Sequence, residues 1–282
     1  PADNRGKAPK ILILDYKGDF SEVNKNNVKF IEKTKVKIVK PKDLPLNIFN
    51  TSDSSASIPW LDRYSFFRDV LSKIYNSQKP IQDANLKKAV KTCFKNINGR
   101  DPTIYDVFQE YTSIVDGKPD TTLSILDDLI DYELFESNPE KIQPFSEFFD
   151  GVIALDLKGI TDEKVKRMII VIFLNFYFDY MMKIVKQPFL GNDPQTRFID
   201  SYLLVDEAHN IMPYDFDVLS KILLQGREFG VGVILASQYF SHFRQNKVDY
   251  MQPIKSWFVH EVSGVKGIDL DRIGLPTAGQ ET

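Results

Sequence analysis

The sequence predicts an α/β fold in which helices cover a mainly parallel β-sheet, with an all-helical insertion in the first half of the chain. Two observations support this fold class. Short apolar runs of strand length alternate with longer helical segments, an order typical of parallel sheets covered on both faces. Residues 59–136, in contrast, show helical periodicity alone. We therefore expect residues 1–58 and 137–282 to form the core and residues 59–136 to form the insertion.

Five apolar runs are predicted as strands of the main sheet, because each is four or five residues long and is bounded by polar or turn-forming residues. A further segment, residues 35–39, alternates between polar and apolar side chains and is predicted as a half-exposed strand. The five runs are residues 11–14, 153–157, 202–205, 233–237 and 257–260.

Four helices are predicted within the insertion. Apolar residues recur at helical spacing over residues 66–74 and again over residues 86–94. Asp101-Pro102-Thr103 is a helix-start signal for residues 104–111, because Pro is tolerated near the first helical position. Residues 121–135 have one apolar face and form the fourth predicted helix.

Two long helices are predicted in the core, at residues 168–185 and 214–229. The first has nearly the length of a membrane span, but it carries Asn175, Asp179 and Lys183. A bilayer span needs about 20 mostly apolar residues, and charged groups inside it cost several kcal/mol. We therefore predict a buried core helix that begins at the N-cap sequence Thr161-Asp162-Glu163, and no membrane partner.

Composition and charge exclude several classes of protein. Of the 282 residues, 43% are hydrophobic and 12% are aromatic, which provides a core and argues against disorder. The net charge of −3 means that any nucleic-acid contact needs a local basic patch or a pore formed by several subunits. The single Cys93 excludes an intrachain disulfide or a cysteine-based zinc site and fits a reducing, cytoplasmic location. The first residues lack the layout of a signal peptide.

The most informative motif is the carboxylate pair Asp206 and Glu207, which directly follows the apolar run of residues 202–205. In ATP hydrolysis, such a pair allows Asp206 to hold Mg²⁺ through water while Glu207 polarises the attacking water. A second apolar run ends at Ser237-Gln238, which would place the Gln238 amide near the γ-phosphate. The alternative interpretation is structural, because an Asp at this position also caps a following helix.

A phosphate-binding loop is absent from the sequence. The pattern Gly-x-x-x-x-Gly-Lys-[Ser/Thr] occurs nowhere, and the two Gly-Lys pairs, at Gly6 and Gly117, run into Ala-Pro and Pro. We therefore expect a fragment, or a protein whose phosphate loop lies outside residues 1–282. Because that loop supplies most of the binding energy for a triphosphate, residues 1–282 alone are expected to bind ATP weakly and to hydrolyse it near background.

Other charged residues have two interpretations each. The Arg227 guanidinium suits a finger that reaches a neighbouring subunit's phosphates, or it complements the dipole at a helix C-terminus. His209, placed one turn into a helix, has no second His at ligand spacing, which favours a supporting hydrogen bond over metal ligation. Two lysine clusters are either solvated faces or DNA contacts. They are the seven lysines from Lys25 to Lys42, and the group Lys87, Lys88, Lys91 and Lys95.

Several segments, taken in order, resemble the HerA/FtsK branch of P-loop ATPases and most closely its HerA-like members. They are residues 11–19, 45–47, 152–159, 203–209 and 226–238, of which the last is the most specific. The helical insertion and residues 224–230 are similar to the HerA-like component of the DNA-phosphorothioation-linked restriction system. The resemblance spans nearly the whole chain and implies a RecA-like core without its phosphate-loop strand. Because that strand is central in the superfamily, its absence should expose apolar edges.

The resemblance implies an ATP- and Mg²⁺-dependent motor that forms a hexameric ring and moves duplex DNA as a translocase or helicase. It assigns Asp206 to Mg²⁺, Glu207 and Gln238 to hydrolysis, and Arg227 to the neighbouring subunit's site. A nuclease or other restriction subunits in anti-phage defence are the implied partners. Two other functions remain open: a degenerate scaffold of the same fold, and a type IV secretion or conjugation ATPase. A Gly-Lys-Ser/Thr loop encoded upstream of Pro1 would favour an ATPase over the scaffold.

Overall fold

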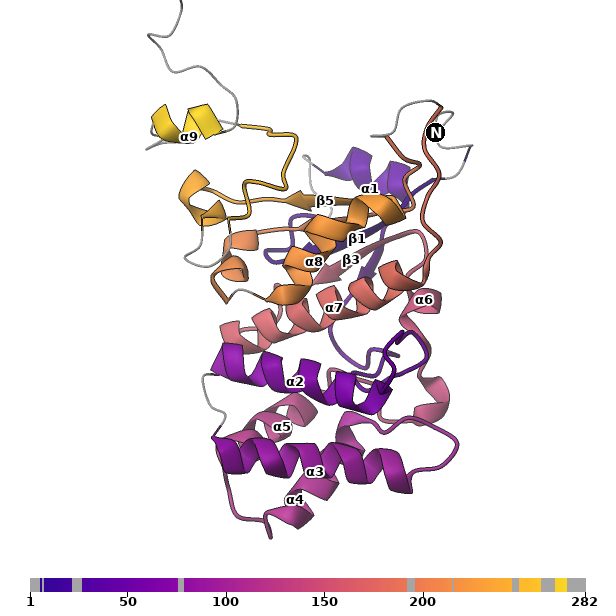
Figure 1. The fold of residues 1–282 in the computed structure, drawn as a ribbon, viewed down its shortest axis with the longest axis vertical. Coiled ribbons are helices and arrows are strands. Elements are labelled where there is room, and N and C mark those ends of the chain that lie inside the picture. Colours follow the sequence, from indigo (N-terminus) through magenta and orange to yellow (C-terminus); the bar gives the residue numbers. More distant parts are fainter. Residues whose placement is uncertain are drawn as a thin grey trace, which may run out of the picture.

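The computed structural model is built around a five-stranded sheet with strand order β2-β3-β1-β4-β5 (Figure 1). Every neighbouring pair of strands is parallel, as the sequence predicts. The structure describes residues 6, 8–21, 27–75, 79–191, 196–214, 216–244, 249–259 and 267–272. The strands are β1 (Lys10–Asp15), β2 (Lys37–Val39), β3 (Val152–Asp156), β4 (Ser201–Val205) and β5 (Val231–Leu235).

The central strands are apolar because both faces of the sheet are covered there. Ile13 of β1 is 1% exposed and lies in register with Ala154 of β3 and Leu204 of β4. The two edge strands are less protected, with Ile38 of β2 41% exposed and Ile234 of β5 47% exposed. Apolar side chains on the open edge of a parallel sheet are unusual, because such sheets are normally buried. The absence of the phosphate-loop strand is expected to expose an apolar edge, and β5 has such an edge.

Helices and short turns surround the sheet. In Figure 1, α7 lies between the strands and α2, and α1 lies on the opposite side of the sheet from α7. The core helices are α1 (Val28–Thr34), α6 (Phe145–Phe148), α7 (Glu163–Lys183), α8 (Asp217–Gln225) and α9 (Gly267–Arg272). Single 3₁₀ turns occur at Pro139–Lys141, Ala208–Asn210, Met212–Tyr214, Gly226–Phe229 and Phe240–Phe243.

α7 is the buried core helix that the sequence predicts. Its N-cap is Asp162, whose carboxylate accepts hydrogen bonds from the N–H groups of Lys164 (2.7 Å) and Val165 (3.2 Å). At the same end, Glu163 accepts a hydrogen bond from the Tyr16 hydroxyl in the loop after β1. Contacts with α2, α6 and α8 cover α7 on its other sides. Within the described ranges, no helix combines the length and apolar character needed to cross a bilayer.

Four helices form what we call the helical lobe: α2 (Pro59–Tyr75), α3 (Pro80–Asn96), α4 (Ile104–Ile114) and α5 (Thr121–Asp131). All four correspond to predicted helices, and the described residues between 59 and 136 contain no strand, only the isolated bridge of Phe135 to Leu44. The predicted start of α4 is confirmed, because the Asp106 N–H donates to Thr103 Oγ1 (3.3 Å) and the Thr103 N–H donates to Asp106 (2.7 Å). The division of the chain into two domains stays a prediction.

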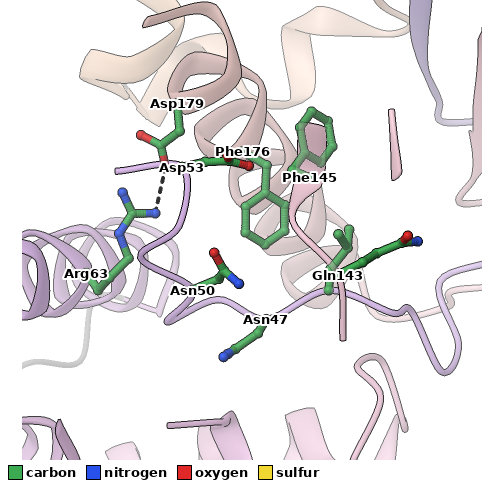
Figure 2. Close-up of a pocket in the computed structure, with 9 residues that line it drawn as sticks. Asn47, Asn50, Asp53, Arg63, Gln143, Phe145, Phe176 and Asp179 are labelled. Atoms are coloured by element: carbon green, nitrogen blue, oxygen red, sulfur yellow. Dashed lines mark ion pairs between the residues drawn. The ribbon is translucent and has the colours of Figure 1, made fainter. Parts of the chain in front are cut away.

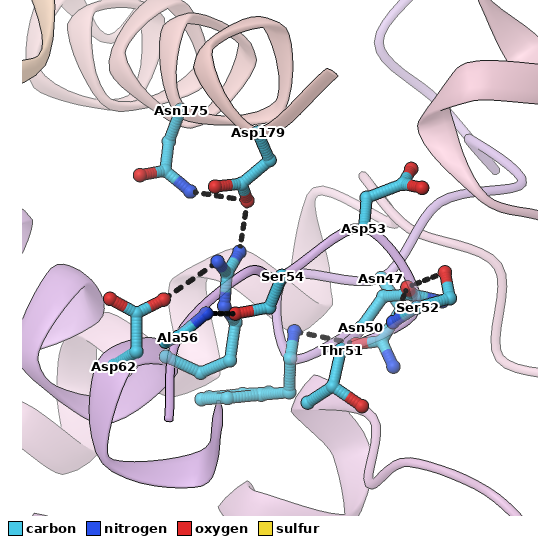
Figure 3. A network of polar contacts seen from close by, with 12 residues as sticks. Asn47, Asn50, Thr51, Ser52, Asp53, Ser54, Ala56, Asp62, Asn175 and Asp179 are labelled. Carbon is cyan, nitrogen blue, oxygen red and sulfur yellow. Dashed lines mark hydrogen bonds and ion pairs between the residues drawn. The ribbon is translucent and has the colours of Figure 1, made fainter. Parts of the chain in front are cut away.

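A buried ion cluster joins the helical lobe to α7 (Figures 2 and 3). Arg63 of α2, whose side chain is 2% exposed, donates to Asp179 of α7 at 2.7 Å and to Asp62 at 2.8 Å. Next to it, Asp53 of the preceding loop accepts from Lys183 at 3.3 Å. Separating Arg63 from Asp179 would leave an unpaired buried charge, which is strongly unfavourable. The cluster therefore holds the lobe in one position on the core.

Two predicted elements differ from the structure. The strand predicted at residues 257–260 is wrong for residues 257–259, which join no ladder, and His260 lies outside the described residues. A strand needs a neighbour to receive its hydrogen bonds, and no described strand lies beside this segment. The helix predicted at residues 214–229 is shorter, because α8 ends at Gln225 and a 3₁₀ turn leads into β5; Asp215 is outside the described residues.

Gly230 enters β5 in a conformation that only glycine adopts easily. Its φ is +70°, and a Cβ there would lie 2.3 Å from the Phe198 carbonyl oxygen and 2.6 Å from Gln187 Cγ. We expect Gly230→Ala to lower the free energy of unfolding by about 2–4 kcal/mol, measured by urea denaturation. Gly99→Ala is the matched control, because Gly99 has φ +81° but nothing within 4 Å of its Cβ, and should lose only about 1 kcal/mol. Equal losses would mean that φ alone sets the effect.

Candidate active site

Three strands deliver polar side chains to one edge of the sheet. β1 ends at Asp15, β4 is followed by Asp206 and Glu207, and Gln238 follows β5 by three residues. Because the strands are parallel, their carboxyl ends meet at the same edge, where ligands of α/β sheets usually bind. The Asp206 N–H donates to the Leu14 carbonyl at 3.1 Å, which ties the first two loops together. The structure thus brings together three of the four predicted site residues: Asp206, Glu207 and Gln238.

Glu207 is the centre of a polar cluster. The residue is 8% exposed, and its Oε1 accepts hydrogen bonds from Lys17 Nζ and from Gln238 Nε2 at 3.1 Å. His209 Nδ1 lies 3.1 Å from Glu207 Oε2. Three side chains from the loops after β1, β4 and β5 therefore surround this carboxylate, and the hydrogen bonds from Lys17 and Gln238 hold it in one orientation.

The backbone of Glu207 is in the left-handed region, with φ 49° and ψ 44°. A residue with a side chain rarely adopts this conformation, which costs about 1–3 kcal/mol and persists only where the surrounding contacts determine it. Here Asn210 supplies such contacts, because its backbone N–H (2.9 Å) and its side-chain amide (3.2 Å) both donate to the Glu207 carbonyl oxygen. Strain of this kind is concentrated at functional sites, and it turns the Glu207 side chain toward Lys17 and Gln238.

The two adjacent carboxyl groups have pKa values shifted in opposite directions. Burial raises the pKa of Asp206, and the charges of Glu207 and Asp15 raise it further, to about 6. Burial also raises the pKa of Glu207, but hydrogen bonds from Lys17 and Gln238 outweigh it and hold this pKa below its ordinary value. At neutral pH, Glu207 is therefore a stabilised anion, whereas the charge of Asp206 is poorly compensated.

Asp206 has the environment that a bound cation would relieve. Its Oδ2 is buried, and no described group donates a hydrogen bond to it. A buried carboxylate oxygen without a donor is unfavourable unless a cation or water compensates it. Across the described ranges no group of three or more His, Cys, Asp and Glu side chains forms a ligand set. Mg²⁺ does not need one, because it is commonly held by one carboxylate with water and substrate phosphates. Asp206 fits that mode.

Asp15 organises the loop that carries Lys17. Asp15 is fully buried, and both of its carboxylate oxygens accept hydrogen bonds from the residues that follow. These bonds fold the loop back so that the Lys17 ammonium reaches Glu207. Neither Asp15 nor Lys17 is among the site residues that the sequence predicts, although an acid directly after an apolar run is the same signal as Asp206. The donors are the N–H groups of Gly18, Asp19 and Phe20 and the hydroxyl of Ser21, at 2.6–3.0 Å.

Two histidines stack beside Glu207. The rings of His209 and His242 have centroids 4.5 Å apart and an interplanar angle of 28°. Ser237 Oγ lies 2.8 Å from His242 Nδ1, and burial together with the neighbouring His209 lowers the pKa of His242. His209 lies in the 3₁₀ turn Ala208–Asn210 and not one turn into a helix as predicted, because the left-handed Glu207 interrupts the chain there. Its Nδ1 lies close to Glu207 but forms no hydrogen bond among the described residues, so the supporting hydrogen bond stays a prediction.

Arg227 lies at the opposite end of the sheet, where β5 begins. It is an exposed residue of the 3₁₀ turn that precedes β5, whereas Gln238 follows the other end of that strand. A five-residue strand spans about 17 Å, so Arg227 is remote from Glu207 and Gln238 of the same chain. Its predicted action on a phosphate therefore requires a neighbouring subunit, and the helix-end interpretation also stays open.

Removing the Asp206 charge should stabilise the chain. The pKa of Asp206 is about 6 in the folded state and 3.8 when unperturbed, so the folded state holds this proton more tightly. The associated stability is present below pH ~4 and is lost as the pH rises through ~6. We expect Asp206→Asn to be about 1–2 kcal/mol more stable than the unsubstituted chain at pH 7, after discounting for solvent screening.

The measurement for Asp206→Asn is the difference in unfolding free energy from the unsubstituted chain across pH 4 to 7, which cancels the titration of other groups. The expected difference grows over that interval. Asp150→Asn, which removes an exposed carboxylate just before β3, at the end of the sheet away from the site, should show no such growth. A difference that is flat with pH would mean that Asp206 is not held as an uncompensated anion.

A groove runs along the open edge of β5, next to the candidate site. Its volume is about 650 Å³. One wall is formed by residues 233–240 and Phe243, and the other by Ile254 and residues 256–259. Ile234 and Phe258 line it and are 47% and 100% exposed. Among the described residues, no strand pairs with this edge of β5. The groove therefore combines unpaired backbone groups with exposed apolar side chains.

No protein-family model matches the sequence, and no curated protein matches it either. Solved structures do. VirB4 of Thermoanaerobacter pseudethanolicus aligns with a TM-score of 0.58 and 16% sequence identity, covering 87% of this chain and 65% of VirB4. The plasmid coupling protein TrwB in complex with ADP and Mg²⁺ aligns with a TM-score of 0.47 and 15% identity, covering 85% of this chain and 59% of TrwB.

The chain thus spans less than two thirds of the length of either protein. The likeness to VirB4 is at the level of fold. It confirms the predicted fold class, because the parallel sheet and its covering helices align with those of VirB4 over 87% of this chain.

Proposed function

We propose that this chain is the hydrolysis half of an ATP-driven motor, in which Asp206 holds Mg²⁺ and Glu207 and Gln238 act on the nucleotide. The observation that supports this most directly is the pair of adjacent carboxyl groups with opposed pKa shifts at the carboxyl edge of the sheet. A simple helix cap would not explain the buried, donor-free Oδ2 of Asp206 or the convergence of Lys17 and Gln238 on Glu207.

Each residue would have a distinct task. Bound Mg²⁺ supplies positive charge against the phosphate oxygens, and Asp206 would hold it through water. Glu207 would accept a hydrogen bond from the attacking water and orient it. Gln238, whose amide already donates to Glu207 at 3.1 Å, would donate instead to the γ-phosphate. Lys17, which lowers the pKa of Glu207, would keep this carboxylate ionised and in place before the nucleotide binds.

The groove beside β5 is where the phosphate loop would be supplied. A parallel strand added there would pair with the free edge of β5 and cover Ile234, and it would also give residues 257–259 a neighbour. Its carboxyl end would emerge beside Gln238, because parallel strands end at the same edge. We propose that the strand preceding a Gly-x-x-x-x-Gly-Lys-[Ser/Thr] loop, from a part of the protein outside residues 1–282, occupies this groove.

ATP hydrolysis by residues 1–282 and by a longer chain that carries such a loop tests the proposal. We expect background turnover from residues 1–282 and Mg²⁺-dependent turnover from the longer chain. In the longer chain, Ile234→Arg should abolish turnover by placing a charge in the groove. Ile38→Arg, at the other exposed edge of the sheet, is the matched control and should not. Turnover that survives Ile234→Arg would contradict docking at β5, and no turnover from the longer chain would favour the scaffold.

At a finer level, we propose a HerA-like DNA translocase or helicase that forms a hexameric ring and works with a nuclease in anti-phage restriction. The resembling segments at residues 203–209 and 226–238 support this assignment. A type IV secretion or conjugation ATPase is the second candidate. The likeness to VirB4 does not decide between them, because at 16% identity it concerns the fold. Stimulation of ATP turnover by duplex DNA would favour the first candidate.

A further inference from the structure

The helical lobe is strongly bipolar in charge. Residues 59–100, which include α2 and α3, contain nine Lys and Arg against three Asp, a net charge of +6. Residues 101–136, which include α4 and α5, contain ten Asp and Glu against one Lys, a net charge of −9. The whole chain has a net charge of only −3. The two signs are therefore separated within one lobe.

The positive charge is displayed as a stripe along α3. Lys87, Lys91 and Lys95 are spaced by four residues, so they fall on one side of the helix over about 12 Å. All three are exposed, and no ion pair joins them to a carboxylate of the described residues. Two of them lie over aromatic rings of α2, with Lys87 5.8 Å from the Tyr64 centroid and Lys91 5.7 Å from the Trp60 centroid. These contacts limit the conformations of the stripe before any partner binds.

The negative charge is crowded on α5. Asp127, Asp128 and Asp131 are exposed, and no described cation pairs with them. Burial, together with the charges of Asp162, Asp127 and Asp131, raises the pKa of Asp128. Like charges at this spacing repel one another, and a cationic partner would remove that repulsion.

The two charged helices lie on different sides of the lobe. α3 packs against α2 and α4, and α5 packs against α4. In Figure 1, α3 lies on the near side of the lobe and α5 lies behind it. One copy therefore cannot bring its own α3 stripe to its own α5 cluster, whereas two copies can.

We propose that the helical lobe is a head-to-tail self-association surface, in which the Lys87–Lys91–Lys95 stripe of one copy docks on the Asp127–Asp128–Asp131 cluster of the next. Charge complementarity selects a second copy as the occupant, because the same chain displays both surfaces. A nucleic acid would bind the α3 stripe but would be repelled by the acidic half of the lobe. Head-to-tail contacts leave one surface free at each end of a pair, so they continue into a closed ring or a filament.

The inference does not depend on ATP hydrolysis, because neither surface includes a residue of the candidate site. Sedimentation velocity of residues 1–282 without nucleotide tests it. We expect self-association at about 0.1 M salt and dissociation at about 1 M salt, where screening shortens to about 3 Å. Changing Lys87, Lys91 and Lys95 to Glu, or Asp127, Asp128 and Asp131 to Lys, should each weaken self-association about ten-fold or more.

The decisive sample is a one-to-one mixture of the two charge-reversed variants. In the mixture, each variant displays the surface that the other needs, so alternating assembly should return although neither variant associates alone. Changing Lys29, Lys33 and Lys40 to Glu alters the net charge equally on the other side of the sheet and should have no effect. If a reversed variant does not fold by circular dichroism, Lys→Gln versions and the salt dependence of the unsubstituted chain replace it.

Three outcomes would overturn the proposal: a chain that stays monomeric at low salt, association that is indifferent to both reversals, or a mixture that does not recover. A monomeric chain that binds duplex DNA, and loses that binding on reversal of the α3 lysines alone, would assign the stripe to nucleic acid instead. Loss of ATP turnover with normal self-association would count against the proposed function and not against this surface.

Discussion

Glu207→Gln is expected to reduce ATP turnover by about 10²-fold or more in the chain that carries a phosphate loop, while ATP and Mg²⁺ still bind. The amide keeps the size of the side chain and can still contact Lys17 and Gln238, but it cannot polarise an attacking water as a carboxylate does. Single-turnover hydrolysis and equilibrium nucleotide binding, measured on the same preparation, separate the two effects. The expected result is a loss of rate without a comparable loss of affinity.

Glu228→Gln is the matched control, because Glu228 is an exposed carboxylate that pairs with Lys186 at the remote edge of the sheet. It should leave turnover unchanged. Asp206→Asn should give a third pattern, in which Mg²⁺-dependent binding weakens, since a neutral amide is a poorer partner for a hydrated cation. Full activity of Glu207→Gln would remove Glu207 from the chemistry and return Asp206 and Glu207 to the interpretation as a cap.

The same variant can test whether Arg227 acts between subunits. Arg227→Ala should bind nucleotide but hydrolyse it slowly in a ring. In rings mixed from Arg227→Ala and Glu207→Gln subunits, some interfaces pair an intact Glu207 with a neighbour's intact Arg227. Those interfaces should recover activity. Verified mixed rings without recovery would leave Arg227 with its helix-end role.

The largest loss of stability is expected at Arg63, the buried cation between α2 and α7. Arg63→Met should lower the free energy of unfolding by about 3–5 kcal/mol, because it leaves the carboxylate of Asp179, which is 14% exposed, without its partner. Urea denaturation measures the loss. Arg100→Met makes the same chemical change at an exposed pair with Asp106 (2.7 and 3.0 Å) and should cost less than about 1 kcal/mol.

A second substitution tells whether the loss arises from the orphaned charge. Asp179→Leu in the Arg63→Met background should recover much of the stability, since a buried ion pair can often be replaced by apolar residues of similar volume. No recovery would indicate that the packing of the Arg63 side chain, rather than the unpaired Asp179, accounts for the effect.

The sequence predicts most of the fold because the relevant signals are local. Strands of a covered parallel sheet are apolar throughout, which identifies β1, β3, β4 and β5. The failure at residues 257–259 has the opposite cause. Their apolar character is suited to a strand, but pairing depends on a neighbour that the described residues do not provide. Local composition cannot report on that neighbour.

The candidate site was only partly predictable for a similar reason. Asp206, Glu207 and Gln238 each follow an apolar run, and a parallel sheet places the ends of such runs at one edge. Lys17 reaches Glu207 only because the loop after β1 folds around the buried Asp15, with hydrogen bonds from four following groups. The stacking of His209 on His242 likewise depends on how two loops cross, which the spacing of residues along the chain does not encode.

The position of α7 gives the molecule a mechanical connection. Near one end of α7, Glu163 accepts a hydrogen bond from Tyr16, the neighbour of Lys17. Sixteen residues later, Asp179 forms an ion pair with Arg63 of the helical lobe. An α-helix of that length is a rod of about 24 Å that resists bending. When Glu207 exchanges Lys17 for a water or a nucleotide, the resulting shift of the loop would pull on one end of this rod. Because the buried Arg63–Asp179 pair fixes the lobe to the other end, the lobe and α7 would move together as one body.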